Sequence, residues 1–181
     1  MRAKTQKTTP IPVKPLQGAV PWVGGKRNLA KVIVPLIEAI PHTCYAEPFV
    51  GAGGVFFRRR FRAECEVVND FSQDVATFFR VLQRHHEALL GEMERSVTTR
   101  VEFERLKAVD PASLTDIERA ARFFYLQYCS YGGKPEGRIF GISPTRASRF
   151  DIVRLKRLLV AIHERLSAVY IDRLDFEAFI R

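Results

Sequence analysis

Apolar side chains recur at helical spacing in several separate segments of the 181-residue chain. Spacing of i, i+3, i+4 and i+7 predicts an amphipathic helix. The predicted helices cover residues 26–39 (with a kink at Pro35), 87–95, 101–109, 114–130 and 150–167. A further helix begins at Ser72, and a short one begins at Asp175. In the first helix the predicted buried stripe comprises Leu29, Val32, Ile33, Leu36 and Ile37.

Two of these helices carry start signals. Ser72 is a favourable N-cap for the helix that places Val75, Phe78, Phe79 and Leu82 on one face. Ser113, with Asp116 three residues later, predicts a capping box at the start of residues 114–130.

Shorter apolar runs between the helices predict strands. The segment TCYAEPF at 43–49 must end near Pro48, and ECEVVNDF at 64–71 buries Val67 and Val68 before it ends at Asn69-Asp70. Residues 168–171 form a third predicted strand. Between the first two, VGAGGVFFRRRF at 50–61 predicts a glycine turn that enters a helix. Strand, turn, helix and strand in this order predict a βαβ unit and a parallel, Rossmann-like α/β sheet.

The remaining segments suggest how the chain is organised. Residues 131–149 form a long loop with four glycines and two prolines, and such loops are usually functional. We expect a disordered basic lead-in over residues 1–18, an α/β part over 19–86, a helical and loop region over 87–149, and a return helix and strand over 150–181 that leave the α/β part incomplete.

Charge and cysteine content narrow the class of protein. The net charge of +9 favours a polyanionic partner, most often nucleic acid. Three widely spaced cysteines without a CxxC pair argue against a disulfide scaffold and against a metal site. The cysteine pattern fits a reducing cytoplasm best. The basic N-terminus has no apolar core like that of a signal peptide, and no apolar run approaches membrane-spanning length, so we expect no membrane partner.

The glycine turn at 51–54 is a candidate ligand site. Gly51 and Gly53 let backbone amides approach a ligand closely, although Phe56 replaces the third glycine of a dinucleotide fingerprint. Asp70 follows Gly51 by 19 positions (70 − 51), close to the roughly 20-residue offset at which an acidic side chain binds ribose hydroxyls. The alternative is that Asp70 only caps the strand end beside Asn69.

Three motifs resemble one enzyme family. WVGGK at 22–26, AEPFVGAGGVFF at 46–57 and VVNDFSQDV at 67–75 are similar to the N-terminal motifs of the DNA adenine methylases, the D12 class of N6-adenine methyltransferases. Residues 122–151 resemble the same region in phage- and prophage-encoded members, and the resemblance spans residues 19–181. It implies a partial Rossmann-like methyltransferase sheet, S-adenosylmethionine (SAM) as cofactor, and an inserted helical DNA target-recognition region.

The resemblance also implies roles for individual residues. Trp22 would form an apolar wall of the cofactor pocket, and Lys26 would pair with the methionyl carboxylate of SAM. Asp70 would bind the ribose. The loop around SAM would comprise Glu47, Pro48, Phe49, Gly51 and Gly53. The region from about 87 to 149 would contact double-stranded DNA, with Lys134, Arg138 and Arg149 as phosphate contacts.

The family's catalytic motif, Asp-Pro-Pro-Tyr, does not occur in the 181 residues, whose one Asp-Pro pair is Asp110-Pro111. In the family this motif accepts hydrogen bonds from the adenine amino group and stacks on the flipped base. No catalytic residue is therefore assigned. We expect the N-terminal part of a DNA adenine methyltransferase, inactive alone. The alternatives are a non-catalytic DNA- or SAM-binding remnant, half of a split enzyme that a C-terminal polypeptide completes, and an unrelated nucleotide-binding domain.

Overall fold

A computed structural model describes residues 11–181 of the chain. Its main sheet has three parallel strands in the order β2-β4-β5: β2 (Cys44–Glu47), β4 (Cys65–Asn69) and β5 (Tyr170–Asp172). The register places Glu47 opposite Val68, and Asn69 opposite Asp172. Parallel strands bring their carboxyl ends to one edge, so the turn after Glu47 and the side chain of Asp70 meet there. The predicted parallel α/β sheet is confirmed.

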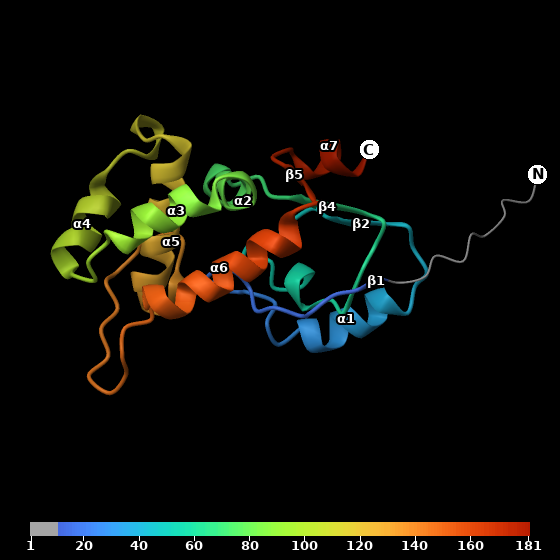
Figure 1. Cartoon of the computed structure of the whole chain (residues 1–181), viewed down its shortest axis with the longest axis horizontal. Helices are drawn as coiled ribbons and strands as arrows, with labels where there is room; N and C mark the ends of the chain where they lie inside the picture. The colour runs from blue at the N-terminus through green and yellow to red at the C-terminus, as the bar shows by residue number, and fades with distance from the viewer. Residues whose placement is uncertain (1–10) are drawn as a thin grey trace, which may run out of the picture.

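Over residues 11–181, seven α-helices surround and extend this sheet. They are α1 (Ala30–Glu38), α2 (Gln73–Arg84), α3 (His86–Glu94), α4 (Arg100–Ala108), α5 (Asp116–Cys129), α6 (Ile152–Leu166) and α7 (Phe176–Ile180). Figure 1 shows α3, α4 and α5 gathered at one end of the molecule, with the sheet and α1 toward the other end and α6 running lengthwise between them. Each of the seven corresponds to one of the predicted helical segments, although the ends differ by up to four residues. None of the helices described over residues 11–181 is both long and apolar enough to cross a membrane.

One hydrophobic core joins the sheet to the helical end. It contains Val68 of β4, Phe78 of α2, Phe103 of α4 and Phe124 of α5, each 1% exposed or less. Full burial of a side chain of this size contributes roughly 1.5–3 kcal/mol. The helical residues 87–149 thus share a core with the α/β residues.

The prediction of a helix after the glycine turn is wrong. Residues Phe56–Arg58 form only a single 3-10 turn (η1). Phe56, Phe57 and Arg59 are all buried, and neighbouring positions cannot all lie on one face of a regular helix. The chain instead continues into strand β3 (Phe61–Arg62), which pairs antiparallel with β1 (Ile11–Pro12).

The same pairing corrects the disordered lead-in expected over residues 1–18. Val13 donates its backbone N–H to the carbonyl of Arg60 at 2.8 Å, and Leu16 donates to the carbonyl of Phe57 at 2.6 Å. Prolines are tolerated here because a two-residue edge strand needs few donors. The expectation is wrong for residues 11–18, and residues 1–10 lie outside the described part.

Helix α1 buries only part of the predicted stripe, since Ile33 and Ile37 pack against the buried cluster and the other three predicted residues do not. Ala30 and Val34 pack against Val55, whereas Leu29, Val32 and Leu36 are 60%, 63% and 63% exposed. The helix also begins at Ala30 rather than at residue 26. Periodicity identified the helix but only part of the face that finds a partner.

The helix caps differ in detail from the predicted ones. The capping box of α5 is Thr115 with Glu118, two residues beyond the predicted Ser113 and Asp116. Ser72 occupies the N-cap position of α2, but its side chain makes no capping hydrogen bond.

Candidate functional site

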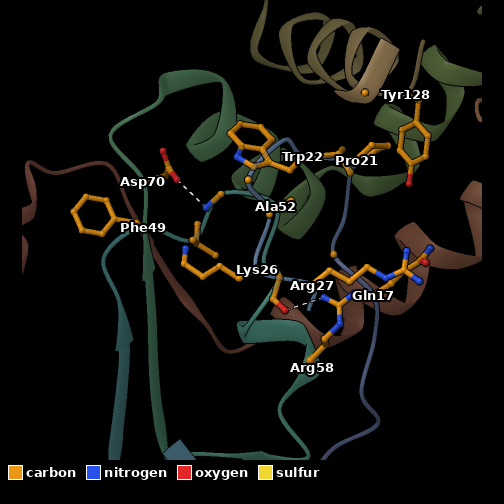
Figure 2. A pocket seen from close by; sticks show the side chains of 18 of the residues that line it. Gln17, Pro21, Trp22, Lys26, Arg27, Phe49, Ala52, Arg58, Asp70 and Tyr128 are labelled. Atoms are coloured by element: carbon orange, nitrogen blue, oxygen red, sulfur yellow. Dashed lines mark hydrogen bonds between the residues drawn. The ribbon is translucent and has the colours of Figure 1, made fainter. Parts of the chain in front are cut away.

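A cavity of about 640 Å³ opens at the carboxyl ends of β2 and β4. A volume of this size accommodates a nucleoside-sized ligand. Side chains from the Trp22 turn, the glycine loop and the end of β4 point into it (Figure 2). The lining residues considered below are Gln17, Trp22, Lys26, Arg27, Glu47, Phe49, Gly51, Arg58, Asp70, Tyr128, Gly132, Arg149 and Arg154.

Asp70 connects the two motifs that end at the cavity. Its Oδ2 accepts a 2.8 Å hydrogen bond from the backbone N–H of Gly51, and its Oδ1 accepts one of 3.0 Å from Ser72. The carboxylate therefore caps the strand end and also lines the cavity. Each carboxylate oxygen keeps a second lone pair that can accept a ligand hydroxyl. Both readings of Asp70 from the sequence are compatible with this geometry.

Trp22 lies over the glycine loop. A Cβ atom added at Gly51 would lie 3.7 Å from the indole Nε1, and the indole ring packs 6.2 Å from the ring of Phe123. Gly51 has a φ of +52°, a left-handed conformation that glycine adopts without strain. The turn at Trp22 closes through a 3.1 Å hydrogen bond from Gly25 N to Trp22 O. The glycines thus place the aromatic ring as one wall of the cavity.

Glu47 is a buried carboxyl group at the end of β2, with 8% of its surface exposed. Burial raises its pKa to about 7, against the opposing effects of a hydrogen bond from Tyr45 and of the charges of Lys26 and Arg59. The Tyr45 hydroxyl donates that hydrogen bond to Oε2 at 2.8 Å. A cationic ligand nearby would stabilise the ionised form of Glu47.

A buried cluster of ion pairs packs against the ring of Tyr45. The carboxylate of Glu66 pairs with Arg59 at 2.6 Å and with Arg165 at 2.5 Å. The guanidinium of Arg59 lies 3.8 Å from the centre of the Tyr45 ring. This stack fixes the ring that donates to Glu47.

The segment after β5 lies beside the glycine loop. Asn69 donates from Nδ2 to the carbonyls of Pro48 and Leu174 at 3.0 Å each, and its Oδ1 accepts from Leu174 N at 2.7 Å. The rings of Phe49 and Phe176 are 5.7 Å apart. The buried amide of Asn69 therefore joins the turn after β2 to the turn before α7.

The structure brings six of the eight predicted cofactor residues to one cavity: Trp22, Lys26, Glu47, Phe49, Gly51 and Asp70. Pro48 and Gly53 belong to the same loop but do not line the cavity. At Gly53, whose φ is +71°, an added Cβ would lie 2.2 Å from the ring of Phe57, so this glycine makes room for the core.

Of the three predicted phosphate contacts, Arg149 alone lines the cavity. Its guanidinium donates to the carbonyl of Ser130. Lys134 is exposed on the loop, outside the cavity lining. Arg138 is turned inward, where its Nη2 donates to Gln127 Oε1 at 3.3 Å and burial lowers its pKa. The structure therefore does not gather these three side chains into one group.

Sequence reasoning missed several lining residues, above all Gln17, Arg27, Arg58, Tyr128 and Arg154. Arg27 stands directly after the predicted Lys26, and this adjacency was the one available signal for it. Arg58 belongs to the run Arg58-Arg59-Arg60, and the sequence pattern alone fits the solvated end of a helix equally well. These missed residues reach the cavity because of the way the chain folds, and no local sequence pattern indicates that they do so.

A family model of the D12 class N6 adenine-specific DNA methyltransferases matches residues 22–136, more than half of the chain. The match contains all six cavity residues that the resemblance had singled out. Members of this family methylate adenine N6 in DNA, and methyltransferases of this kind generally use SAM. The chain therefore belongs to the D12 class N6 adenine-specific DNA methyltransferases.

Proposed function

We propose that the cavity binds SAM and that the protein serves methyl transfer to adenine N6 in double-stranded DNA. The observation that carries this proposal is the convergence of Trp22, Lys26, Glu47, Phe49, Gly51 and Asp70 on one cavity of about 640 Å³. When bound, SAM supplies a methyl group on a positively charged sulfur.

The donor set fits this cofactor. In our assignment Lys26 pairs with the methionyl carboxylate, because an ammonium and a carboxylate form a charge-assisted hydrogen bond. The indole of Trp22 tolerates a nearby sulfonium through cation–π attraction. Asp70 accepts hydrogen bonds from the ribose hydroxyls, and Glu47 faces the cationic part of the ligand.

The 181 residues contain no Asp-Pro-Pro-Tyr motif. In our proposal the residues for the chemical step are therefore supplied by a further strand that carries this motif. Within residues 11–181, β2 is hydrogen-bonded on one side only, to β4. Its other edge has free backbone donors and acceptors for a further parallel strand. A strand there would end beside Glu47, at the same edge as the cavity. We therefore propose that the chain alone binds SAM but does not transfer its methyl group.

We further propose that α3 to α5 and the loop over 131–149 face DNA, with Lys134 and Arg149 as the candidate phosphate contacts, whereas Arg138 is turned inward to Gln127. The exposure of Lys134 supports its part in this, and the position of Arg149 between cavity and loop supports a backbone contact near the cofactor. Such contacts position DNA without reading its sequence.

The test is methyl transfer from SAM labelled on the methyl group to duplex DNA, with and without an added polypeptide that carries Asp-Pro-Pro-Tyr. We expect SAM binding by the chain alone and DNA methylation only with the added polypeptide. Methylation by the chain alone would contradict the requirement for a further strand. Binding of SAM and DNA that no such polypeptide converts into methylation would indicate a non-catalytic binding protein, the alternative favoured by the missing motif.

A further inference from the structure

The cavity has a second, strongly basic side that the cofactor assignment does not use. Arg27 and Arg58 line it beside the amide side chain of Gln17, and Arg149 and Arg154 also line the cavity. Over the described residues 11–181, none of these four arginines forms an ion pair with a carboxylate. The basic side therefore lacks counter-ions of its own.

Arg27 and Arg58 are the pair that matters most. Arg58 is anchored by a 2.8 Å hydrogen bond from its Nη1 to the carbonyl of Gly54. Burial and the nearby positive charge of Arg27 lower its pKa. Figure 2 shows both guanidinium groups on the side of the cavity near Gln17, away from Asp70. Two cations held together without a carboxylate repel each other, and an anion between them would remove that repulsion.

We propose that Arg27 and Arg58 bind one phosphate group of the DNA strand whose adenine enters the cavity. This inference rests on the proposed function. SAM contains no phosphate, and its single carboxylate is assigned to Lys26. Guanidinium groups match phosphate geometry because two N–H groups can donate in parallel. The contact positions the backbone of the flipped nucleotide and leaves sequence recognition to other residues.

The shape of the surface supports a strand path past this pair. A second cavity of about 680 Å³ lies under the loop 131–149 and shares Tyr128, Gly132 and Arg149 with the first. The two cavities therefore adjoin at these three residues, between the cofactor residues and the loop. Arg146 adds a further cation to the second cavity. A DNA strand that lies along both cavities would meet Arg27 and Arg58 in the first, Arg149 where the two adjoin, and Arg146 in the second.

The test compares DNA binding by Arg27→Gln, Arg58→Gln and the double variant, with Arg84→Gln as the matched control. Arg84 is exposed at the end of α2 and lines neither cavity. Fluorescence anisotropy of a labelled duplex oligonucleotide is measured over a range of salt concentrations. Each cavity variant should weaken binding about tenfold. Each should also reduce the slope of log K against log salt by about 0.9, the value for one phosphate, and the double variant should lose little more.

SAM affinity, measured by calorimetry on the same variants, separates this inference from the proposed function. We expect it to stay within about twofold of the wild type, because the arginines do not contact SAM. Variants that lose SAM affinity but keep DNA affinity would assign the arginines to the cofactor carboxylate and overturn the inference.

An unchanged salt slope in both single variants, or no DNA binding by the wild type at low salt, would also overturn the inference. Wild-type DNA binding that depends on Arg27, without any SAM binding, would support the phosphate site and refute the cofactor assignment. Arg27 is exposed, so its variant keeps the test valid even if Arg58→Gln disturbs folding.

Discussion

The backbone amide of Gly51 donates a 2.8 Å hydrogen bond to Oδ2 of Asp70, across 19 positions of the sequence. This bond ties the turn after β2 to the end of β4. The left-handed φ of +52° at Gly51 lets the amide turn toward the carboxylate. The shape of the glycine loop and the proposed ribose ligand thus depend on the same side chain.

Asp70→Asn should lower SAM affinity about 10- to 100-fold. Gly51 and Ser72 donate to different oxygens of Asp70, and in asparagine one of these two positions carries an NH₂ group, which would face an amide donor instead of accepting from it. Trp22 is the one tryptophan of the chain, so its fluorescence reports binding directly. Asp116→Asn, at an exposed carboxylate on α5, is the control. Unchanged affinity in Asp70→Asn would leave Asp70 as a strand-end cap alone.

Trp22→Ala should weaken SAM binding about tenfold or more, and Trp22→Phe by only a few fold, because phenylalanine keeps an aromatic face toward the ligand. Calorimetry is the appropriate measurement, since these variants lose the fluorescent reporter. Equal losses in both variants would show that the indole N–H, rather than the aromatic wall, makes the contact.

Glu47→Gln should change how stability depends on pH. The pKa of Glu47 is raised from an ordinary 4.5 to about 7. Between pH 4.5 and about 7, Glu47 is protonated in the folded protein but ionised in the unfolded chain. The free energy of unfolding therefore falls as pH rises through this range. The fall amounts to about 3 kcal/mol and levels off above pH 7. Glu47→Gln removes this contribution.

The measurement for Glu47 is urea denaturation of the wild type and of Glu47→Gln at a series of pH values. The difference between their unfolding free energies isolates Glu47 from the other titrating groups. We expect the wild type to lose stability relative to the variant as pH rises from about 5 to 8. A difference that stays constant with pH would contradict the raised pKa.

Much of the fold could be predicted from the sequence where the pattern is local. The helices with Phe78 and Leu159 carry several regularly spaced apolar residues, and the glycine turn and Asp70 stand at the spacing that parallel strands impose. The short pairing of Ile11–Pro12 with Phe61–Arg62 could not be predicted, because two-residue strands have no periodicity and their partners are far apart in sequence.

In the candidate site, too, the residues in local motifs could be predicted from the sequence, and those brought together only by the fold could not. Trp22, Lys26 and Asp70 belong to motifs, so resemblance identified them. Arg27 and Arg58 become neighbours only because the loop after β2 folds back toward the Trp22 turn. Arg138, by contrast, belongs to a polar loop that predicts exposure, yet its side chain turns inward to Gln127.

Arg59→Ala should destabilise the protein by about 3–5 kcal/mol, because it leaves the buried Glu66 with one cation fewer and removes the stack on Tyr45. Arg80→Ala removes a solvent-exposed pair with Asp116 and should cost about 0–1 kcal/mol. Urea denaturation of both variants measures the contrast. A small effect of Arg59→Ala would mean that Arg165 alone compensates Glu66.

Calorimetric titration of SAM into the purified wild-type chain, repeated with Asp70→Ala, tests the cofactor assignment most directly. We predict saturable binding at one site with a micromolar dissociation constant, reduced at least about tenfold in Asp70→Ala. Absence of binding at millimolar SAM, or equal binding by both proteins, would contradict the assignment of this cavity to the cofactor.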